Sequence, residues 1–359
     1  MSEAKRVIVL SVDRLRTQFL GCYGNAWIAT PAIDRLACES IVFDDAHASG
    51  PNLTDFFQSA WHPAAREWIA GATSTFISDD AEATALAGAA GFAEVIELPS
   101  GVGAAQAEDL EETHLASVFA AATEQLLQTP HEANLFWLHI GSLGQVWDAP
   151  RALRERYHED DDAPLPEFVE PPCKLLAANF DPDERWGCAL AYAAQISTFD
   201  ACLDLFLEQL RTSALWSNAT FLLCGVRGYP LGEHRRVGPF DESLYGELLH
   251  VPWIMRLPSA AQAQQRRPEL TSAEDLAAII HGAAPTARER LTFSSAEEET
   301  ALRTREWFLR RTIRAGEPRV ELYVKPDDRW EVNNVHDRCR DVVEELLAAP
   351  IQSLPSPGR

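Results

Sequence analysis

Short apolar runs typical of strands alternate along this chain with longer stretches typical of helices. Strands that alternate with helices pair mostly in parallel, and the helices between them cover the sheet. We therefore expect an α/β fold with a mostly parallel central sheet and helices on both faces. The expected strands are Arg6–Asp13, Ile41–Ala46, Ser74–Ile77, Glu94–Leu98, Asn134–Ile140, Ala219–Val226 and His250–Arg256. The expected helices are Thr30–Cys38, Ala81–Ala89, Ala107–Leu127, Trp186–Thr212 and Ala273–Gly282.

Two regions depart from this alternation. The segment Asp148–Asp183 is rich in proline and acidic residues, which predicts a long surface excursion. From about Glu306 the pattern changes to short strands and a closing helix. We expect an α/β domain over residues 1–300 and a small antiparallel sheet subdomain with a helix over residues 301–359. The expected elements of the subdomain are strands Trp307–Ile313 and Val320–Val324 and a helix at Asp337–Ala348.

The charge of the chain excludes two classes of partner. Its 359 residues include 31 Lys and Arg and 54 Asp and Glu, which gives a formal net charge of −23. Binding to nucleic acid or to an anionic membrane rests on Lys and Arg, so we expect neither partner. The same charge repels sulfate and phosphate esters at long range unless a local positive site compensates.

The apolar pattern and the cysteines indicate a protein of the cytoplasm. The first apolar run is short and ends at Asp13, as a core strand does and a signal peptide does not. No run reaches the roughly 18 apolar residues of a membrane helix. The seven cysteines are scattered and form no Cys-x-x-Cys pair, which suits free thiols in a reducing compartment.

The stretch Phe221–His234 is the most informative segment of the chain. It reads FLLCGVRGYPLGEH, an apolar strand and a glycine-punctuated turn that end in Leu231, Gly232, Glu233 and His234. This resembles the sulfatase branch of the alkaline-phosphatase superfamily. There the strand ends in Ser-Asp-His-Gly or Ser-Asp-Asn-Gly, and Leu-Gly-Glu-His follows.

Further segments match this family in the family's own order, so the resemblance covers nearly the whole chain. It implies the sulfatase fold, whereas function is a separate question. The matching segments are Val7–Arg16, Leu20–Asn25, Thr30–Ala37, Ile41–Ala48, Trp186–Leu210, Leu244–Ile254 and Glu321–Val335.

For an active member, the resemblance implies a Ca²⁺ ion with oxygen ligands, a formylglycine or threonine nucleophile, an arginine and a histidine acid. At the family's Asp-His pair this chain has Val226, which offers no ligand, and Arg227, which brings a positive charge. Asp13 matches a metal-binding Asp of the family, but Arg14 follows where many members have a second Asp. We expect no bound metal and no cofactor.

The two arginines offer a replacement for the lost cation. We expect Asp13, Arg14 and Arg227 to converge at the strand ends, because the family brings the matching positions together around its ion. Their guanidinium groups then neutralise Asp13. Two alternatives stay open: Asp13 caps the next turn, or Arg227 binds an anion.

The loop after the second strand lacks the family's nucleophile. The family has Pro-x-Cys/Ser-x-Pro-x-Arg, and alignment on Pro51 puts Leu53 at the nucleophile and Phe57 at the arginine. Leucine cannot attack, and phenylalanine cannot hold an anion. A shift of one residue offers Thr54, since threonine is the nucleophile in some relatives. Thr54 is otherwise an ordinary turn or cap residue.

Two histidines occupy positions that match the family. His139 matches the first His of the family's x-His-x-x-Asp-Pro-His strand ending, but the second His is absent. A hydrogen-bonded core histidine is the alternative for His139. His234 follows Gly232 and Glu233, where relatives have the rim of the site. For His234 a structural hydrogen bond and a functional role stay equally open.

These positions together predict a sulfatase-family protein that has lost sulfuric-ester hydrolase activity. Such a pseudoenzyme would bind a protein partner or a small ligand through the remnant pocket or its surface. The pocket residues are Asp13, Arg14, Leu53, Thr54, His139, Arg227 and His234. One alternative is an active ester hydrolase with a rearranged site. Another is a folded relic without a specific role.

Overall fold

The structure is a computed structural model of the whole chain. It describes residues 6–128, 134–213, 215–240, 243–296, 298–314 and 316–348, and of Arg314 only the backbone. The start of the expected α/β domain, residues 1–5, and the end of the expected subdomain, residues 349–359, lie outside the described residues.

An eight-stranded sheet forms the centre of the molecule, in the order β10-β2-β9-β7-β1-β5-β3-β4. Strand β9 runs antiparallel to β2 and β7, and the other neighbours are parallel. The predicted mostly parallel sheet is confirmed, and every predicted strand of it is present. The strands are β1 (Val7–Val12), β2 (Ile41–Ala46), β3 (Ser74–Ser78), β4 (Glu94–Glu97), β5 (Leu135–Ile140), β7 (Thr220–Gly225), β9 (Trp253–Arg256) and β10 (Gln265–Thr271).

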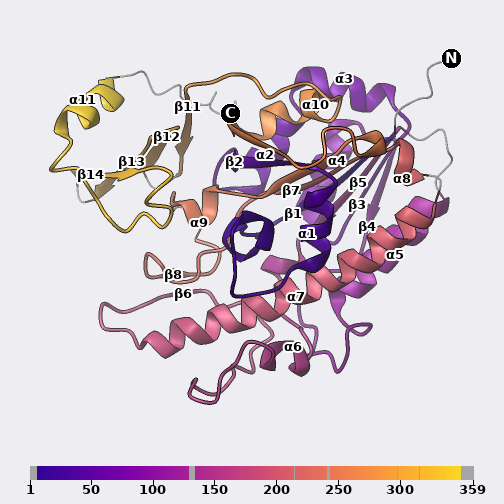
Figure 1. Cartoon of the computed structure of the whole chain (residues 1–359), viewed down its shortest axis with the longest axis horizontal. Helices are drawn as coiled ribbons and strands as arrows, with labels where there is room; N and C mark the ends of the chain where they lie inside the picture. The colour runs from indigo at the N-terminus through magenta and orange to yellow at the C-terminus, as the bar shows by residue number, and fades with distance from the viewer. Residues whose placement is uncertain are drawn as a thin grey trace.

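Alternating residues of β1 belong to two hydrophobic cores, one on each face of the sheet. Ile8 and Leu10 pack with one group of helices, and Val7 and Val9 with the other. In Figure 1, α7 crosses one side of the sheet and α3 and α10 lie on the opposite side. The first group is α1 (Pro31–Cys38), α5 (His114–Gln128) and α7 (Pro182–Thr212). The second is α2 (Leu53–Ala60), α3 (Pro63–Gly71), α4 (Ala81–Ala90) and α10 (Leu276–Ile279).

Helix α7 has 31 residues and is long and apolar enough to cross a membrane by length and composition alone. Within the fold, 83% of its most apolar window is buried. Its apolar residues pack against α5 and the sheet, among them Phe199, Leu203 and Phe206. The apolar character of α7 is therefore accounted for by the protein core.

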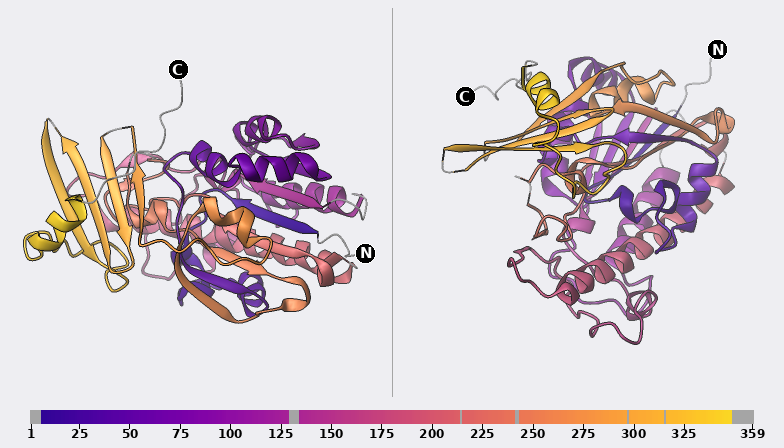
Figure 2. Two further views of the ribbon diagram at one scale, coloured as in Figure 1. Left: turned by 90° about the horizontal axis from the view of Figure 1, so that it is seen from above. Right: turned by 60° about the vertical axis from the view of Figure 1, so that its left-hand side comes forward.

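A second, four-stranded antiparallel sheet stands at one end of the molecule beside the main sheet (Figure 2). Residues of β13 alternate between two surfaces: Phe308 joins the main core, and Leu309 packs in a small core with Val343 of α11. The expected C-terminal antiparallel sheet is thereby confirmed. Its elements are β11 (Arg290–Ser294), β12 (Glu299–Thr304), β13 (Trp307–Arg314), β14 (Glu317–Val324) and α11 (Arg340–Ala348).

Several element boundaries differ from the sequence-based expectation, and local caps explain two of them. Helix α5 begins at His114, because the Thr113 hydroxyl accepts a hydrogen bond from the amide of Ala116 at 3.2 Å. Helix α7 begins earlier than expected, at Pro182, because Asp181 caps its first turn. The expected helix at Ala273–Gly282 is reduced to a 3₁₀ turn and α10.

Short elements complete the chain. The excursion at Asp148–Asp183 is irregular apart from α6 (Arg151–Glu155), β6 (Lys174–Leu175) and its last two residues, which begin α7. Other short elements are α8 (Leu215–Asn218), α9 (Gly246–Leu249) and β8 (Arg236–Val237), together with 3₁₀ turns at Thr17–Phe19, Gly21–Tyr23, Ser142–Gly144 and Pro258–Ala260.

Candidate functional site

The candidate site lies at the carboxyl ends of β1 and β7, which are neighbours in the sheet. Val12 at the end of β1 is paired in register with Gly225 at the end of β7. Asp13 follows the first strand, and Val226 and Arg227 follow the second. In open α/β sheets this edge is where ligands gather.

A bidentate ion pair joins the two strand ends. The Arg227 guanidinium donates from Nε to Asp13 Oδ1 at 2.9 Å and from Nη2 to Asp13 Oδ2 at 2.8 Å. The Nε of Arg14 lies 3.5 Å from Asp13 Oδ2. All three residues are buried. The expected convergence of Asp13, Arg14 and Arg227 is therefore observed.

The electrostatics of the pair keep Asp13 ionised. Burial alone would raise the pKa of Asp13, but the charges of Arg227 and Arg14 and the hydrogen bonds from Arg227 lower it to about 2. An ionised carboxylate without partners would be very costly at this depth. Arg227 thus makes the buried carboxylate tolerable.

Arg14 is held by its backbone as well as by its charge. Its φ of 64° lies in the left-handed region, which is uncommon for a residue other than glycine. The Tyr192 hydroxyl donates to the Arg14 carbonyl at 2.6 Å, and Arg14 Nη1 lies 3.4 Å from the carbonyl of Gly228. These contacts from α7 and from the turn after β7 fix the arginine beside Asp13.

The segment that aligns with the nucleophile loop is helical from Leu53 onward. Asn52 and Asp55 form a reciprocal capping box that starts α2. The Leu53 side chain is buried, and the Phe57 ring stacks on Trp61 with their centroids 4.3 Å apart. The positions of the family's nucleophile and arginine therefore belong to the apolar core.

Thr54 makes a contact with α4. Its hydroxyl donates to Glu82 Oε1 at 2.8 Å, on a part of the surface that water reaches. Thr54 lies in the first turn of α2, whose N-cap is Asn52, so the sequence-based interpretation of Thr54 as a turn or cap residue is corrected to a helical one.

His139 is a fully buried residue at the end of β5. Its Nδ1 lies 3.0 Å from the Ser11 hydroxyl, which also accepts a hydrogen bond from Trp137 Nε1 at 2.8 Å. Its Nε2 is buried and has no hydrogen-bond partner among the residues that the structure describes. Burial lowers the pKa of His139, although Asp13 acts in the opposite direction. A neutral core imidazole, packed edge-on against Phe57, fits these contacts.

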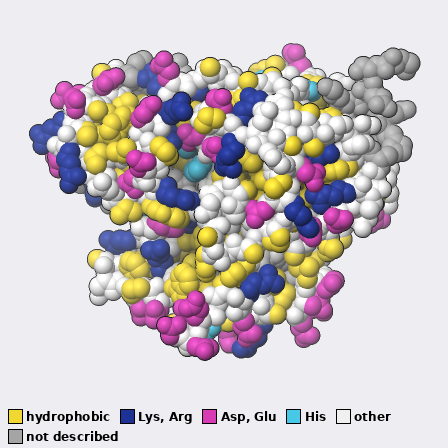
Figure 3. Space-filling model, in the orientation of Figure 1, with side chains coloured by type: hydrophobic (Ala, Val, Ile, Leu, Met, Phe, Trp, Pro, Cys, Tyr) yellow, Lys and Arg dark blue, Asp and Glu magenta, His cyan; other side chains and the backbone are white. Residues whose placement is uncertain are grey.

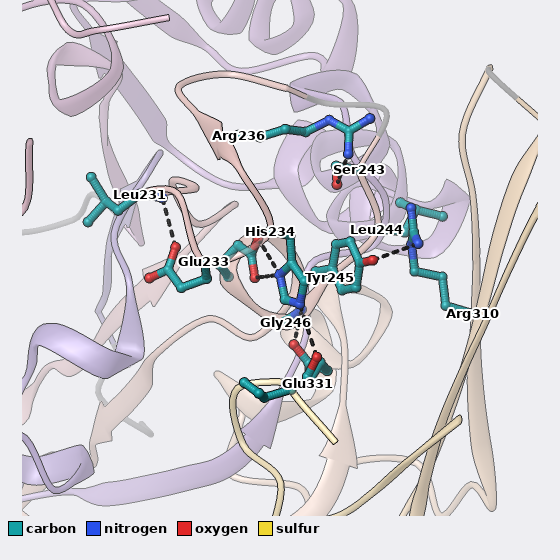
Figure 4. A network of polar contacts seen from close by, with 12 residues as sticks. Leu231, Glu233, His234, Arg236, Ser243, Leu244, Tyr245, Gly246, Arg310 and Glu331 are labelled. Carbon is teal, nitrogen blue, oxygen red and sulfur yellow. Dashed lines mark hydrogen bonds and ion pairs between the residues drawn. The ribbon is translucent and has the colours of Figure 1, made fainter. Parts of the chain in front are cut away.

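His234 is bonded to the C-terminal part of the chain instead of the ion pair (Figure 4). Its Nδ1 lies 2.9 Å from both Glu247 carboxylate oxygens, and its Nε2 lies 3.1 Å from the carbonyl oxygen of Glu331. Its ring stacks on Tyr245 at a centroid distance of 3.5 Å. Of the two roles left open for His234, these contacts supply the structural one.

Sequence reasoning missed three contributors to this region. The Pro51 carbonyl accepts a hydrogen bond from Arg227 Nη1 at 2.9 Å, which ties the nucleophile loop to the ion pair. Glu247 and Glu331 hold His234. Both glutamates lie in segments that resemble the family, but the resemblance does not say that these residues contact His234. The capping pattern Asn-x-x-Asp at residues 52–55 was the available signal for α2.

The residues at the strand ends do not fit the Ca²⁺ ion that the resemblance implies. Both oxygens of Asp13 accept hydrogen bonds from Arg227, and the side chain beside it is Val226. Among the described residues, no group of three or more His, Cys, Asp or Glu side chains could hold a metal ion. Calcium takes six to eight oxygen ligands, which these groups do not supply.

Comparison with known proteins identifies one family. The model of the sulfatase family matches residues 64–286 of this chain. No curated protein matches the chain in sequence.

Solved structures give the same fold at low sequence identity. The phosphonate monoester hydrolase of Agrobacterium radiobacter has a TM-score of 0.72 and 15% identity, over 96% of this chain and 95% of that chain. A 2-O GAG sulfatase has a TM-score of 0.69 and 14% identity, over 96% and 91%. A structure in complex with its substrate D-glucosamine-2-N,6-O-disulfate has a TM-score of 0.67 and 14% identity, over 96% and 97%.

Proposed function

This chain belongs to the sulfatase family, and we propose that it has lost sulfuric-ester hydrolysis and acts as a binding protein. The observation that carries the proposal is the buried ion pair between Asp13 and Arg227. The Arg227 guanidinium neutralises the Asp13 carboxylate and occupies the position beside it, where a cation would otherwise bind. Without a cation, the ancestral route to an activated nucleophile and a stabilised anion has no Lewis acid.

The side chains around the ion pair support the same proposal. A nucleophile needs a reactive atom with a base beside it, whereas Leu53 is an apolar core residue. The Nε2 of His139 is buried, so a proton on it has no path to a substrate. Several parts of the ancestral machinery are missing together, which a single rearrangement does not repair.

Two further proposals concern what the protein binds and where in the cell it acts. We propose a protein partner or a small ligand as the bound species, and the cytoplasm as the compartment. All seven cysteines are free, which supports a reducing environment.

One contact favours the alternative of a rearranged hydrolase. The Thr54 hydroxyl and the Glu82 carboxylate form a hydrogen-bonded pair of the kind that activates a nucleophile. The pair lies on α2 and α4, and His139 is buried away from solvent. A hydrolase built on Thr54 would therefore use Glu82 as its base.

An ester-hydrolysis assay with the purified chain tests the proposal. Aryl sulfate, aryl phosphate and phenylphosphonate monoesters are incubated with the wild type and with Thr54→Ala, with and without Ca²⁺. We expect no turnover above background in any mixture. Turnover by the wild type that disappears in Thr54→Ala would establish the rearranged hydrolase instead. Turnover that persists in Thr54→Ala and depends on Ca²⁺ would contradict the loss of the ancestral site.

A further inference from the structure

A cavity of about 420 Å³ lies between the end of β2, helix α9 and the C-terminal sheet. Its lining includes Asp45 and His47 from the main sheet and Arg303, Phe308 and Lys325 from the C-terminal sheet and the turn after it. Figure 3 shows a hollow on this face in which a histidine is visible, with basic side chains around it. The volume is in the range of small-molecule sites, about 300–1,000 Å³.

The floor of the cavity is neutral. The rings of His47 and His250 stack with their centroids 5.4 Å apart. Burial lowers the pKa of His47, and burial with the neighbouring His47 lowers that of His250 to about 3. His47 Nε2 lies 2.7 Å from Asp45 Oδ1, and a carboxylate only accepts, so Nε2 carries the hydrogen. Neither imidazole adds charge to the cavity at neutral pH.

Each carboxylate that lines the cavity already has a basic partner. Asp45 accepts two hydrogen bonds from Arg303 Nη2, at 2.9 and 3.0 Å. Asp44 is paired with Arg266, and Glu331 with Lys325. The acidic groups are therefore neutralised within the wall.

Two further arginines line the cavity as surplus positive charge. Arg305 and Arg329 form no ion pair with a described residue, and both are exposed. The guanidinium of Arg329 lies over the ring of Trp330, 5.0 Å from its centroid, which leaves its charge available. In a chain with a net charge of −23, this local excess of positive charge favours anions at one place.

An apolar wall stands beside these charges. The apolar part of the lining is formed by Phe308, Leu249, Pro268 and Pro326, of which the two prolines are exposed and Phe308 and Leu249 are buried. Guanidinium groups recognise carboxylate and phosphate through paired hydrogen bonds, and an aromatic wall favours a flat apolar group. The cavity thus offers complementary surfaces to the two ends of one small molecule.

We propose that this cavity binds a small organic anion, a carboxylate or phosphate attached to a compact apolar group. The anionic end lies between Arg305 and Arg329, and the apolar end lies against the apolar lining formed by Pro268, Pro326 and the edge of Phe308. The inference rests on the proposed binding role and names its ligand class. The site is formed by residues other than the Asp13–Arg227 pair, so substrate hydrolysis and ligand binding can be measured separately.

Calorimetric titration of the full-length chain tests the proposal. The probes are phenyl phosphate and benzoate, with inorganic phosphate and phenol as fragments that each lack one end. We expect saturable binding of phenyl phosphate or benzoate, weaker binding of both fragments, and weaker binding at high salt. Removal of both arginines in Arg305→Ala/Arg329→Ala should weaken binding at least about tenfold, as the loss of charge-assisted hydrogen bonds does.

A charge-matched variant provides the control. Arg311→Ala/Arg340→Ala removes two positive charges from β13 and α11 without touching the cavity lining. This control should bind like the wild type. An equal loss in both double variants, or no saturable binding of either probe, would overturn the inference. Release of phenol from phenyl phosphate would contradict the proposed loss of hydrolysis and leave the binding result standing.

Discussion

Arg227 supplies from a side chain the positive charge that active sulfatases take from a cation. A carboxylate as deeply buried as Asp13 loses several kcal/mol of hydration, and the two hydrogen bonds from Arg227 offset that loss. A guanidinium also keeps its charge at any physiological pH and needs no ligand shell. Asp13 and Arg227 therefore depend on each other for stability.

Removal of Arg227 should expose this dependence. Arg227→Ala leaves Asp13 buried without its main partner, and we expect a loss of about 3 kcal/mol or more in the free energy of unfolding. Asp13→Asn combined with Arg227→Leu should recover part of that loss, because neither residue is then charged. A double-mutant cycle by denaturant unfolding measures the coupling.

An exposed ion pair serves as the control for that cycle. Arg151 and Glu155 form an i,i+4 pair on the surface of α6, and Arg151→Ala should leave the free energy of unfolding nearly unchanged, because solvent screens an exposed pair. Additive effects of the substitutions at Asp13 and Arg227 would show that the arginine is incidental to the fold.

The sequence predicts contacts at the strand ends better than contacts across the sheet. Asp13 and Arg227 could be placed together because both directly follow strands that the family resemblance puts at one site. The bond between Ser11 and His139 depends on the register of β1 against β5, in which these two residues are direct neighbours. An apolar pattern does not specify which residues of two strands lie opposite each other.

At the scale of elements, a buried polar layer joins the C-terminal sheet to the main domain. Arg310 of β13 donates from Nη2 to Glu299 at 2.7 Å and from Nη1 to Glu321 at 2.7 Å. The Arg310 guanidinium lies 4.0 Å from the centroid of the Tyr245 ring, and His234 stacks on that same ring. The link to the main domain is completed by the Tyr245 hydroxyl, which donates to Glu321 at 2.9 Å, and by the Leu244 amide, which donates to Glu299 at 2.7 Å. Because these buried carboxylates bond both the C-terminal sheet and the main domain, the contacts fix the two in one relative position.

His234 is positively charged in this layer, because both of its ring nitrogens face groups that only accept hydrogen bonds. Burial alone would lower the pKa of His234, but the hydrogen bond and charge of Glu247 raise it above the ordinary value. A raised pKa in the folded state stabilises the protein below the unfolded value of about 6.5, and this contribution is lost as pH rises through the folded pKa. Burial also raises the pKa of Glu331, which acts in the same direction.

His234→Gln should therefore cost more stability at pH 6 than at pH 9. We expect a loss of about 2 kcal/mol at pH 6, the scale of hydrogen bonds to charged groups. Unfolding by urea at several pH values measures it. The control is His336→Gln near the surface, for which we expect a change within about 0.5 kcal/mol at each pH. An equal cost of His234→Gln at both pH values would show that His234 is neutral in the fold.

The strands that the sequence pattern missed are polar or short. Strand β10 reads QRRPELT, and its pairing with β2 shifts between Arg267 and Leu270, on either side of Pro268. Proline and charged residues are typical of edge strands, which bury little and therefore carry a weak apolar signal. Strand β11 buries only Phe293, whereas β12 buries Ala301 and Leu302 together with the charged residues Glu299 and Arg303, which interrupt its apolar pattern.

At the scale of the whole molecule, the C-terminal sheet shares a core with the main domain. Phe308 and Tyr323 belong to the same hydrophobic cluster as Phe43 and Trp253 of the main sheet. The cavity proposed as a ligand site lies at this junction, so a ligand there contacts both sheets. Binding to the native state alone would therefore stabilise the whole chain.

Calcium should give no such stabilisation, because Arg227 neutralises Asp13 and the described residues supply no group of three or more metal ligands. If the native protein had a Ca²⁺ site, Ca²⁺ at a concentration of about 100 times its Kd would add about 2.7 kcal/mol to the free energy of unfolding. That is enough to raise the melting temperature by several degrees. The net charge of −23 attracts any cation weakly, so the comparison is between millimolar Ca²⁺ and NaCl of equal ionic strength. We expect equal melting temperatures for the wild type in the two salts.

Val226→Asp/Arg227→Asn restores the family's residues at both positions and serves as the matched variant, in which we expect a calcium-dependent rise in melting temperature. A calcium-specific rise of several degrees in the wild type would show that the ion pair opens to admit the metal, and the loss of the ancestral site would have to be abandoned.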